Sequence, residues 1–160
     1  GLPAEVVARV IKERVTLTPG GPALVRTMRA HGAYTCLVSG GFTAFTDQIA
    51  SMIGFHESRA NHLDVADGKL TGTVAEPIVG REAKLATLHE LTARFEIDKA
   101  DTLVVGDGAN DLDMLLDAGL GVAYHAKPTV AASAHVRLDH GDLTALLYLQ
   151  GYHREEFVAG

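Results

Sequence analysis

Hydrophobic and polar positions follow two different periods along the chain, and this predicts helices and short strands in alternation. Between Pro3 and residue 14 the apolar side chains recur at helical spacing, and the TPGG segment at 18–21 ends this first helix. A second helix runs from there towards Gly32. The same periodicity predicts further helices at 43–53, 81–96, 111–118, 128–134 and 142–150.

Short apolar runs between these helices predict strands at 34–41, 102–106, 119–124 and 136–138. Residues 62–74 differ, because apolar and polar positions alternate on both sides of Asp67-Gly68, a dipeptide suited to a tight hairpin turn. The sequence therefore predicts an α/β fold, in which a parallel sheet carries helices on both faces and a β-hairpin is inserted. Ligand chemistry is expected at the carboxyl ends of the parallel strands.

Composition narrows the class of protein. The chain of 160 residues is the size of one domain, and we expect a single domain over 1–160. It carries 14 basic and 20 acidic side chains without a Lys/Arg-rich run, which argues against nucleic acid or a membrane as partner. Cys36 is the only cysteine, so no disulfide can form within the chain, and we expect a cytoplasmic protein in which Cys36 serves packing.

Acidic residues cluster where the 102–106 strand ends. Asp107 stands between Gly106 and Gly108, with Asn110 and Asp111 at the start of the next helix. Helix capping could account for Asn110 or Asp111 alone. It does not account for Asp107, which Asp111 would repel unless a cation lay close by. Oxygen ligands without histidine or cysteine favour Mg²⁺ over zinc, so the sequence predicts a magnesium ligand at Asp107.

Two other positions near this motif have simpler interpretations. Asp113 lies one step further along the same helix and is expected to face solvent. On the 34–41 strand, Ser39 is followed by two glycines and a helix, a pattern that suits either an anion-binding turn or a plain strand-to-helix turn. The predicted metal site favours the anion-binding alternative for Ser39 and Gly40.

The ordered motifs resemble one enzyme family. LVSGGF at 37–42, Lys84, GDGAND at 106–111 and AKP at 126–128 together resemble the phosphoserine phosphatases of the haloacid-dehalogenase superfamily. The resemblance extends over nearly the whole chain, including VTLTPG at 15–20. It implies a haloacid-dehalogenase-like Rossmannoid core with magnesium as cofactor and the small molecule phosphoserine as substrate.

The resemblance also implies a role for each motif residue. Ser39 and Gly40 would bind the phosphoryl group, and Lys84 would neutralise its charge beside the nucleophile. Asn110 would contact the substrate phosphate. Asp107 would ligate magnesium, and Asp111 would orient the metal shell. A phosphoryl group in transfer carries negative charge spread over its oxygens. This charge is stabilised by a hydroxyl, an ammonium and a metal ion placed around the group.

One element of the family pattern is absent from the sequence. The resemblance implies a nucleophilic aspartate in an Asp-x-Asp pair at the end of a first strand, together with cap helices that grip the amino acid. The chain holds one Asp-x-Asp, at 111–113, inside a predicted helix rather than at a strand end. We therefore expect residues 1–160 to be the C-terminal part of a phosphatase core. A missing N-terminal segment would complete the sheet between the Ser39 and Asp107 strands, and 1–160 alone would be inactive.

Two alternatives to a phosphoserine hydrolase remain. A phosphotransferase that moves the phosphoryl group to another alcohol, such as homoserine, would share every motif present here. A non-catalytic phosphate- or metal-binding remnant would also lack the nucleophile. The joint presence of Ser39, Lys84, Asp107, Asn110 and Asp111 argues against the remnant.

Overall fold

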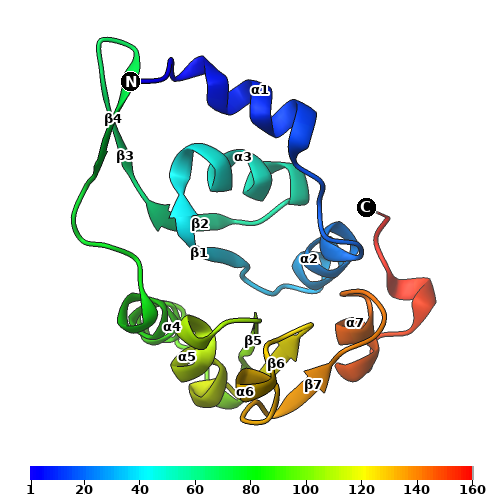
Figure 1. Cartoon of the computed structure of the whole chain (residues 1–160). Helices are drawn as coiled ribbons and strands as arrows, with labels where there is room; N and C mark the ends of the chain where they lie inside the picture. The colour runs from blue at the N-terminus through cyan, green and yellow to red at the C-terminus, as the bar shows by residue number, and fades with distance from the viewer. Residues whose placement is uncertain (160) are drawn as a thin grey trace. The chain divides into compact units, whose positions relative to one another are not determined.

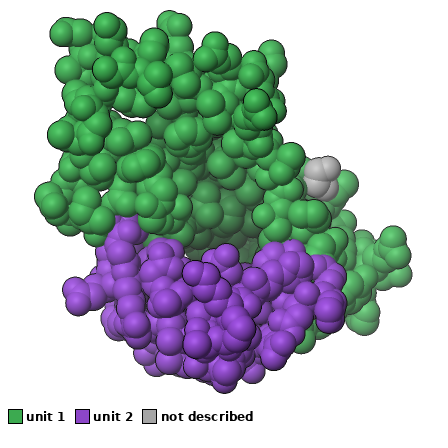
Figure 2. All heavy atoms as spheres, viewed as in Figure 1, with its two compact units in different colours: residues 1–78, 142–160 green, residues 79–141 purple. Residues whose placement is uncertain are grey.

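A computed structural model describes residues 1–159. The chain forms two compact units, Gly1–Ile78 with Asp142–Gly160, and Val79–Gly141 (Figure 2). The expectation that residues 1–160 act as one domain stays a prediction.

The first unit contains the amphipathic helices that the periodicity predicted. Helices α1, α2 and α3 span Glu5–Arg14, Gly21–Ala30 and Thr43–Ile53, as expected (Figure 1). Their inward positions are apolar: Val7 and Ile11 of α1, like Leu24 and Val25 of α2, are buried. Helix α7, Ala145–Leu149, is shorter than the predicted 142–150.

Strand β1, Cys36–Phe42, pairs in parallel with a strand that the sequence did not predict, β2, Glu57–Asn61. The segment ESRAN lacks the apolar positions that mark a half-buried strand. Its polar side chains instead find polar partners in other segments of the chain: Glu57 accepts a hydrogen bond from Tyr34 Oη at 2.7 Å, and Ser58 donates to Asp47. The backbone ladder with β1, rather than side-chain burial, therefore defines this strand.

The pairing of β1 with β2 is irregular at one point. Val38 lies opposite Arg59, but the next pair is Phe42 with Asn61. Strand β1 thus takes four steps where β2 takes two, and the surplus residues form a bulge that leaves the ladder. The 39–41 turn, the segment predicted to bind an anion, lies in this bulge.

The predicted hairpin is confirmed. Strands β3, Leu63–Ala66, and β4, Lys69–Val74, pair antiparallel around Asp67 and Gly68, whose φ angles are 50° and 72°. Two positive φ angles in succession match the turn type that the Asp-Gly dipeptide favours.

The second unit is built on a three-stranded parallel sheet. Its strands β5, Leu103–Gly106, β6, Leu120–Tyr124, and β7, Val136–Leu138, lie in the order β5-β6-β7. The helices of this unit are α4, Arg81–Arg94, α5, Leu112–Asp117, and α6, Pro128–Ala131. The predicted helix at 111–118 begins with a separate 3-10 turn, η2, Ala109–Asp111. The core of the unit is apolar and consists of Val104, Met114, Leu115, Ala118, Ala123, Val130 and Ala131.

The α/β class predicted from the sequence is confirmed, although the parallel strands do not form one continuous ladder. Within residues 1–159 they form two ladders, β1-β2 and β5-β6-β7. Strands β1 and β5 each keep one edge without a partner strand from the described residues. No helix in the same residues is long and apolar enough to cross a bilayer.

Candidate active site

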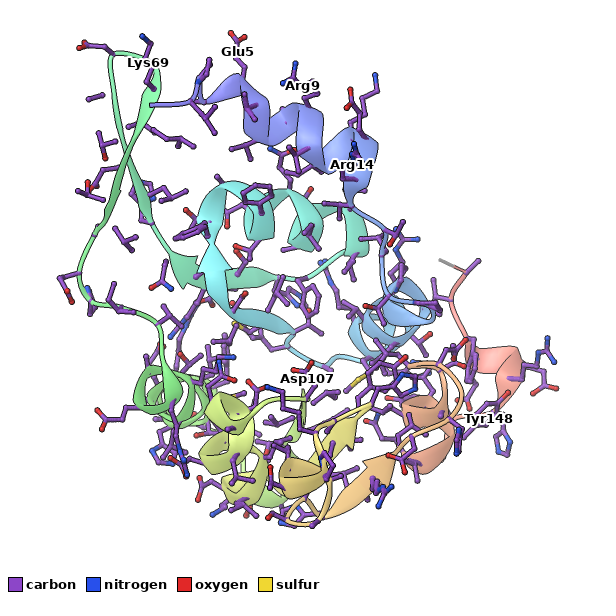
Figure 3. All side chains as sticks on the ribbon, in the orientation of Figure 1. Glu5, Arg9, Arg14, Lys69, Asp107 and Tyr148 are labelled. Atoms are coloured by element: carbon purple, nitrogen blue, oxygen red, sulfur yellow. The ribbon has the colours of Figure 1, made fainter. Side chains whose placement is uncertain are left out.

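Asp107 follows the last residue of β5, at the carboxyl end of the parallel sheet, as predicted (Figure 3). Its side chain is exposed, and no side chain within residues 1–159 pairs with its carboxylate. The backbone on either side is fixed. The carbonyl of Asp107 accepts a hydrogen bond from the N–H of Lys127 at 3.2 Å, and its own N–H donates to Asp111 Oδ2 at 3.2 Å. A rigid backbone therefore presents a free carboxylate to solvent.

Asp111 holds this loop in place. Its side chain is buried, with 7% of the residue exposed, and Oδ2 accepts hydrogen bonds from the N–H groups of Asp107 and Gly108. Gly106 permits the close approach, because a Cβ at that position would lie 2.6 Å from the Cβ of Asp111. The position of the Asp111 side chain therefore requires a residue without a Cβ at position 106.

Lys84 lies in the first turn of α4 and is only 5% exposed. Its Nζ donates to Asp111 Oδ1 at 2.6 Å. A buried ammonium needs such a partner, because an unpaired charge in the interior is costly. The ordinary alternative, a solvated lysine on a helix surface, is therefore excluded.

The ion pair between Lys84 and Asp111 also bears on the predicted metal ion. The repulsion expected between Asp107 and Asp111 pointed to a nearby metal ion. The Lys84 ammonium instead compensates the negative charge of Asp111. Repulsion between Asp107 and Asp111 therefore does not by itself require a metal ion here. The case for a metal at Asp107 depends on its own exposed carboxylate.

Asp113 lies at the surface, in agreement with the prediction, but it is paired. The guanidinium of Arg81 donates to both carboxylate oxygens of Asp113, each at 2.5 Å. This hydrogen bonding lowers the pKa of Asp113 and raises that of Arg81. Both acids of the 111–113 Asp-x-Asp pair are thus engaged by cations in a helical segment, which is not the arrangement of a free nucleophile.

Asn110 is exposed on η2, immediately before Asp111. Its Oδ1 would lie 2.9 Å from a Cβ at position 108, so its side chain folds back over Gly108. The amide is therefore near the loop that carries Asp107. Its contact with a substrate phosphate stays a prediction.

The predicted anion-binding residues belong to the first unit. Within the bulge of β1, Ser39 Oγ accepts a hydrogen bond from the N–H of Gly41 at 2.9 Å. The carbonyl of Gly40 accepts one from Asn61 Nδ2, also at 2.9 Å. Sequence reasoning missed Asn61, because its strand, β2, carries no hydrophobic pattern. The Ser39 hydroxyl keeps its proton available, which is what a phosphate oxygen would require.

The residues present meet only part of what a magnesium site requires. Mg²⁺ takes six oxygen ligands in near-octahedral geometry. Residues 1–159 contain no group of three or more His, Cys, Asp or Glu side chains placed to hold a metal ion. Asp107 can therefore contribute one protein ligand, and the rest of a shell must come from water, substrate or other protein groups.

Comparison with known proteins places these motifs in a family context. The family model of haloacid dehalogenase-like hydrolases matches residues 1–116. The chain is 45% identical over 159 residues to the phosphoserine phosphatase of Streptomyces coelicolor, covering 99% of this chain and 38% of that protein. It is 40% identical over 145 residues to the phosphoserine phosphatase of Haemophilus influenzae, covering 91% of this chain and 46% of that protein. The chain thus spans less than half the length of these two relatives.

Solved structures agree with this result. The unliganded probable phosphoserine phosphatase of Vibrio cholerae superposes with a TM-score of 0.86 at 38% identity, over 91% of this chain and 45% of that one. A structure described as a phospho-aspartyl intermediate analogue of phosphoserine phosphatase gives 0.85 at 36% identity, over 92% of this chain and 70% of that one.

Proposed function

The chain belongs to the haloacid dehalogenase-like hydrolase family, and from this premise we propose that it forms part of a phosphoserine phosphatase. The reaction would hydrolyse O-phosphoserine to serine and inorganic phosphate. The observation that carries the proposal is the Lys84–Asp111 ion pair, buried directly behind the loop that presents Asp107. The proposed substrate, phosphoserine, is inferred from the family of the chain and from the phosphoserine phosphatases that it resembles.

The roles of the side chains follow from charge. A phosphoryl group in transfer spreads negative charge over its oxygens, and fixed positive groups and hydrogen-bond donors stabilise that charge. The Lys84 ammonium is held by Asp111 and cannot reorient freely, so it acts as a preorganised cation. The Ser39 hydroxyl and the Asn110 amide would each serve as a donor to a phosphate oxygen, and the backbone of Gly40 would permit close approach.

Asp107 would serve as a ligand of Mg²⁺. Its carboxylate is exposed and unpaired within residues 1–159, while its backbone is fixed by Lys127 and Asp111. When bound, the ion would withdraw charge from the phosphoryl oxygens. Asp111 would orient the metal shell indirectly. It would do so by holding both the Lys84 ammonium and the backbone of Asp107 through its hydrogen bonds.

The acceptor of the phosphoryl group would come from outside residues 1–160. We assign it to the first aspartate of an Asp-x-Asp pair at the end of a further strand, which would become an aspartyl-phosphate and then be hydrolysed. Two findings support this assignment. Strands β1 and β5 each have an open edge within residues 1–159, and the carboxylates at 111 and 113 are both engaged by cations.

The test is product analysis with the full-length protein. Incubation with O-phosphoserine and Mg²⁺ is expected to release serine and inorganic phosphate in equal amounts, with or without added homoserine. Formation of phosphohomoserine at the expense of inorganic phosphate would instead identify a phosphotransferase. Absence of both products, with phosphate still bound, would contradict an enzymatic role and identify a binding protein.

A further inference from the structure

A buried amide holds the turn that is proposed to bind phosphate. Asn61 ends β2, is only 6% exposed, and donates from Nδ2 to the carbonyl of Gly40 at 2.9 Å. The two residues are 21 positions apart in the chain, so the bond joins the end of one strand to the middle of its neighbour. We infer that Asn61 is a positioning residue that sets the shape of the 39–41 turn for phosphate binding.

The irregular register explains why such a residue is needed. The pairs Val38–Arg59 and Phe42–Asn61 enclose a bulge in which Ser39, Gly40 and Gly41 leave the ladder. Backbone groups in a bulge lose the ladder partners that regular pairing would give them. The Asn61 amide supplies a donor to the carbonyl at the centre of the bulge and so limits the orientations of the peptide that follows it.

A second bond inside the turn makes its shape depend on that anchor. Ser39 Oγ accepts the N–H of Gly41 at 2.9 Å, across the same peptide whose carbonyl Asn61 fixes. While Asn61 holds the Gly40 carbonyl, Ser39 Oγ accepts the N–H of Gly41. The hydroxyl proton of Ser39 is then available to donate to a bound phosphate. If the carbonyl were released, the turn could rotate and the direction of that donor would be lost.

Burial gives the anchor its strength. A buried amide donor such as that of Asn61 costs about 1 to 3 kcal/mol when it loses a partner, so positions of the turn that break this bond are disfavoured. Misplacement of a binding group by about 1 Å can reduce catalysis on the order of 100-fold. Asn61 does not itself need to touch the phosphate to exert this effect.

The inference rests on the proposed function, because it takes Ser39 and Gly40 as the groups that bind the phosphoryl group. The test uses the full-length protein with Asn61→Asp, which keeps the side-chain shape but replaces the donor by an acceptor. Asn61→Ala serves as second variant, since it removes the donor without adding a charge. Inorganic phosphate is the probe, titrated as a competitive inhibitor and, independently of activity, by calorimetry.

Thr27→Val is the matched control. Thr27 is in the same unit, is 0% exposed, and its Oγ1 accepts the N–H of Val158 at 2.8 Å rather than a group of the 39–41 turn. All three substitutions remove a hydrogen bond made by a buried side chain and should lower the urea midpoint. Only the Asn61 variants are expected to weaken phosphate binding, by about 10-fold or more, and to lower kcat/KM for phosphoserine by about 10- to 100-fold.

The outcomes separate the inference from the function on which it rests. If the Asn61 variants bind phosphate as tightly as Thr27→Val does, the positioning role is wrong even if the enzyme hydrolyses phosphoserine normally. If the wild-type protein binds phosphate but does not turn over phosphoserine, the proposed function fails. A selective loss of phosphate affinity in the Asn61 variants would support the positioning role in either case.

Discussion

Asp107→Asn is expected to abolish hydrolysis of phosphoserine by the full-length protein, whereas Asp113→Asn is expected to leave it largely intact. The two aspartates are six positions apart and differ in what they contact. Asp107 presents an exposed, unpaired carboxylate at the end of β5, while Asp113 is bound by the guanidinium of Arg81. Removing one charge at position 107 would weaken magnesium binding and with it the stabilisation of the phosphoryl charge.

The measurement is kcat as a function of Mg²⁺ concentration for both variants and the wild type. Asp113→Asn should reproduce the wild-type midpoint of activation, since it removes only a surface ion pair. Asp107→Asn should show no saturable activation, although its urea midpoint should remain close to that of the wild type. Equal loss of activity at the two positions would refute the assignment of the ion to Asp107.

Lys84→Met is expected to lower kcat by about 100-fold or more, because it removes the fixed cation that would face the phosphoryl group. The structure adds a second expected effect. Asp111 would keep its negative charge in a buried position without its cationic partner, which costs about 3 to 5 kcal/mol of stability. Loss of activity in this variant therefore has two possible origins.

The double variant Lys84→Met/Asp111→Asn separates these origins. Asparagine at 111 carries no charge, and its amide oxygen can still accept from the N–H groups of Asp107 and Gly108. The urea midpoint should therefore recover relative to Lys84→Met alone, while kcat stays low. If kcat recovers together with stability, Lys84 serves only to neutralise Asp111 and has no direct role in catalysis.

Sequence reasoning succeeded where local chemistry determines the structure. The apolar run before Gly106 places Asp107 at a strand end, and the Asp67-Gly68 dipeptide adopts the positive φ angles that a tight hairpin turn needs. Both predictions depend on neighbouring residues in the chain. The amphipathic helices follow for the same reason, since their buried positions recur every three or four residues.

It failed where the determining partner is distant in the chain. Strand β2 has a polar sequence and is defined by its ladder with β1, about 20 residues earlier. The burial of Lys84 depends on Asp111, 27 positions away, and the function inferred for Asn61 depends on Gly40, 21 positions away. No local pattern encodes these contacts, because each joins residues that come together only when the chain folds.

The central claim is that residues 1–160 carry the phosphate-binding turn, the fixed lysine and one metal carboxylate, but not the acceptor of the phosphoryl group. It is tested most directly by phosphate release from O-phosphoserine by the 1–160 polypeptide with Mg²⁺. No release is expected from the polypeptide alone. Release should return when a peptide is added whose apolar strand ends in Asp-x-Asp and pairs with an open strand edge. It should stay absent with the first aspartate changed to asparagine. Robust hydrolysis by the polypeptide alone, with its mass confirmed, would contradict the claim and place the nucleophile among residues 1–160.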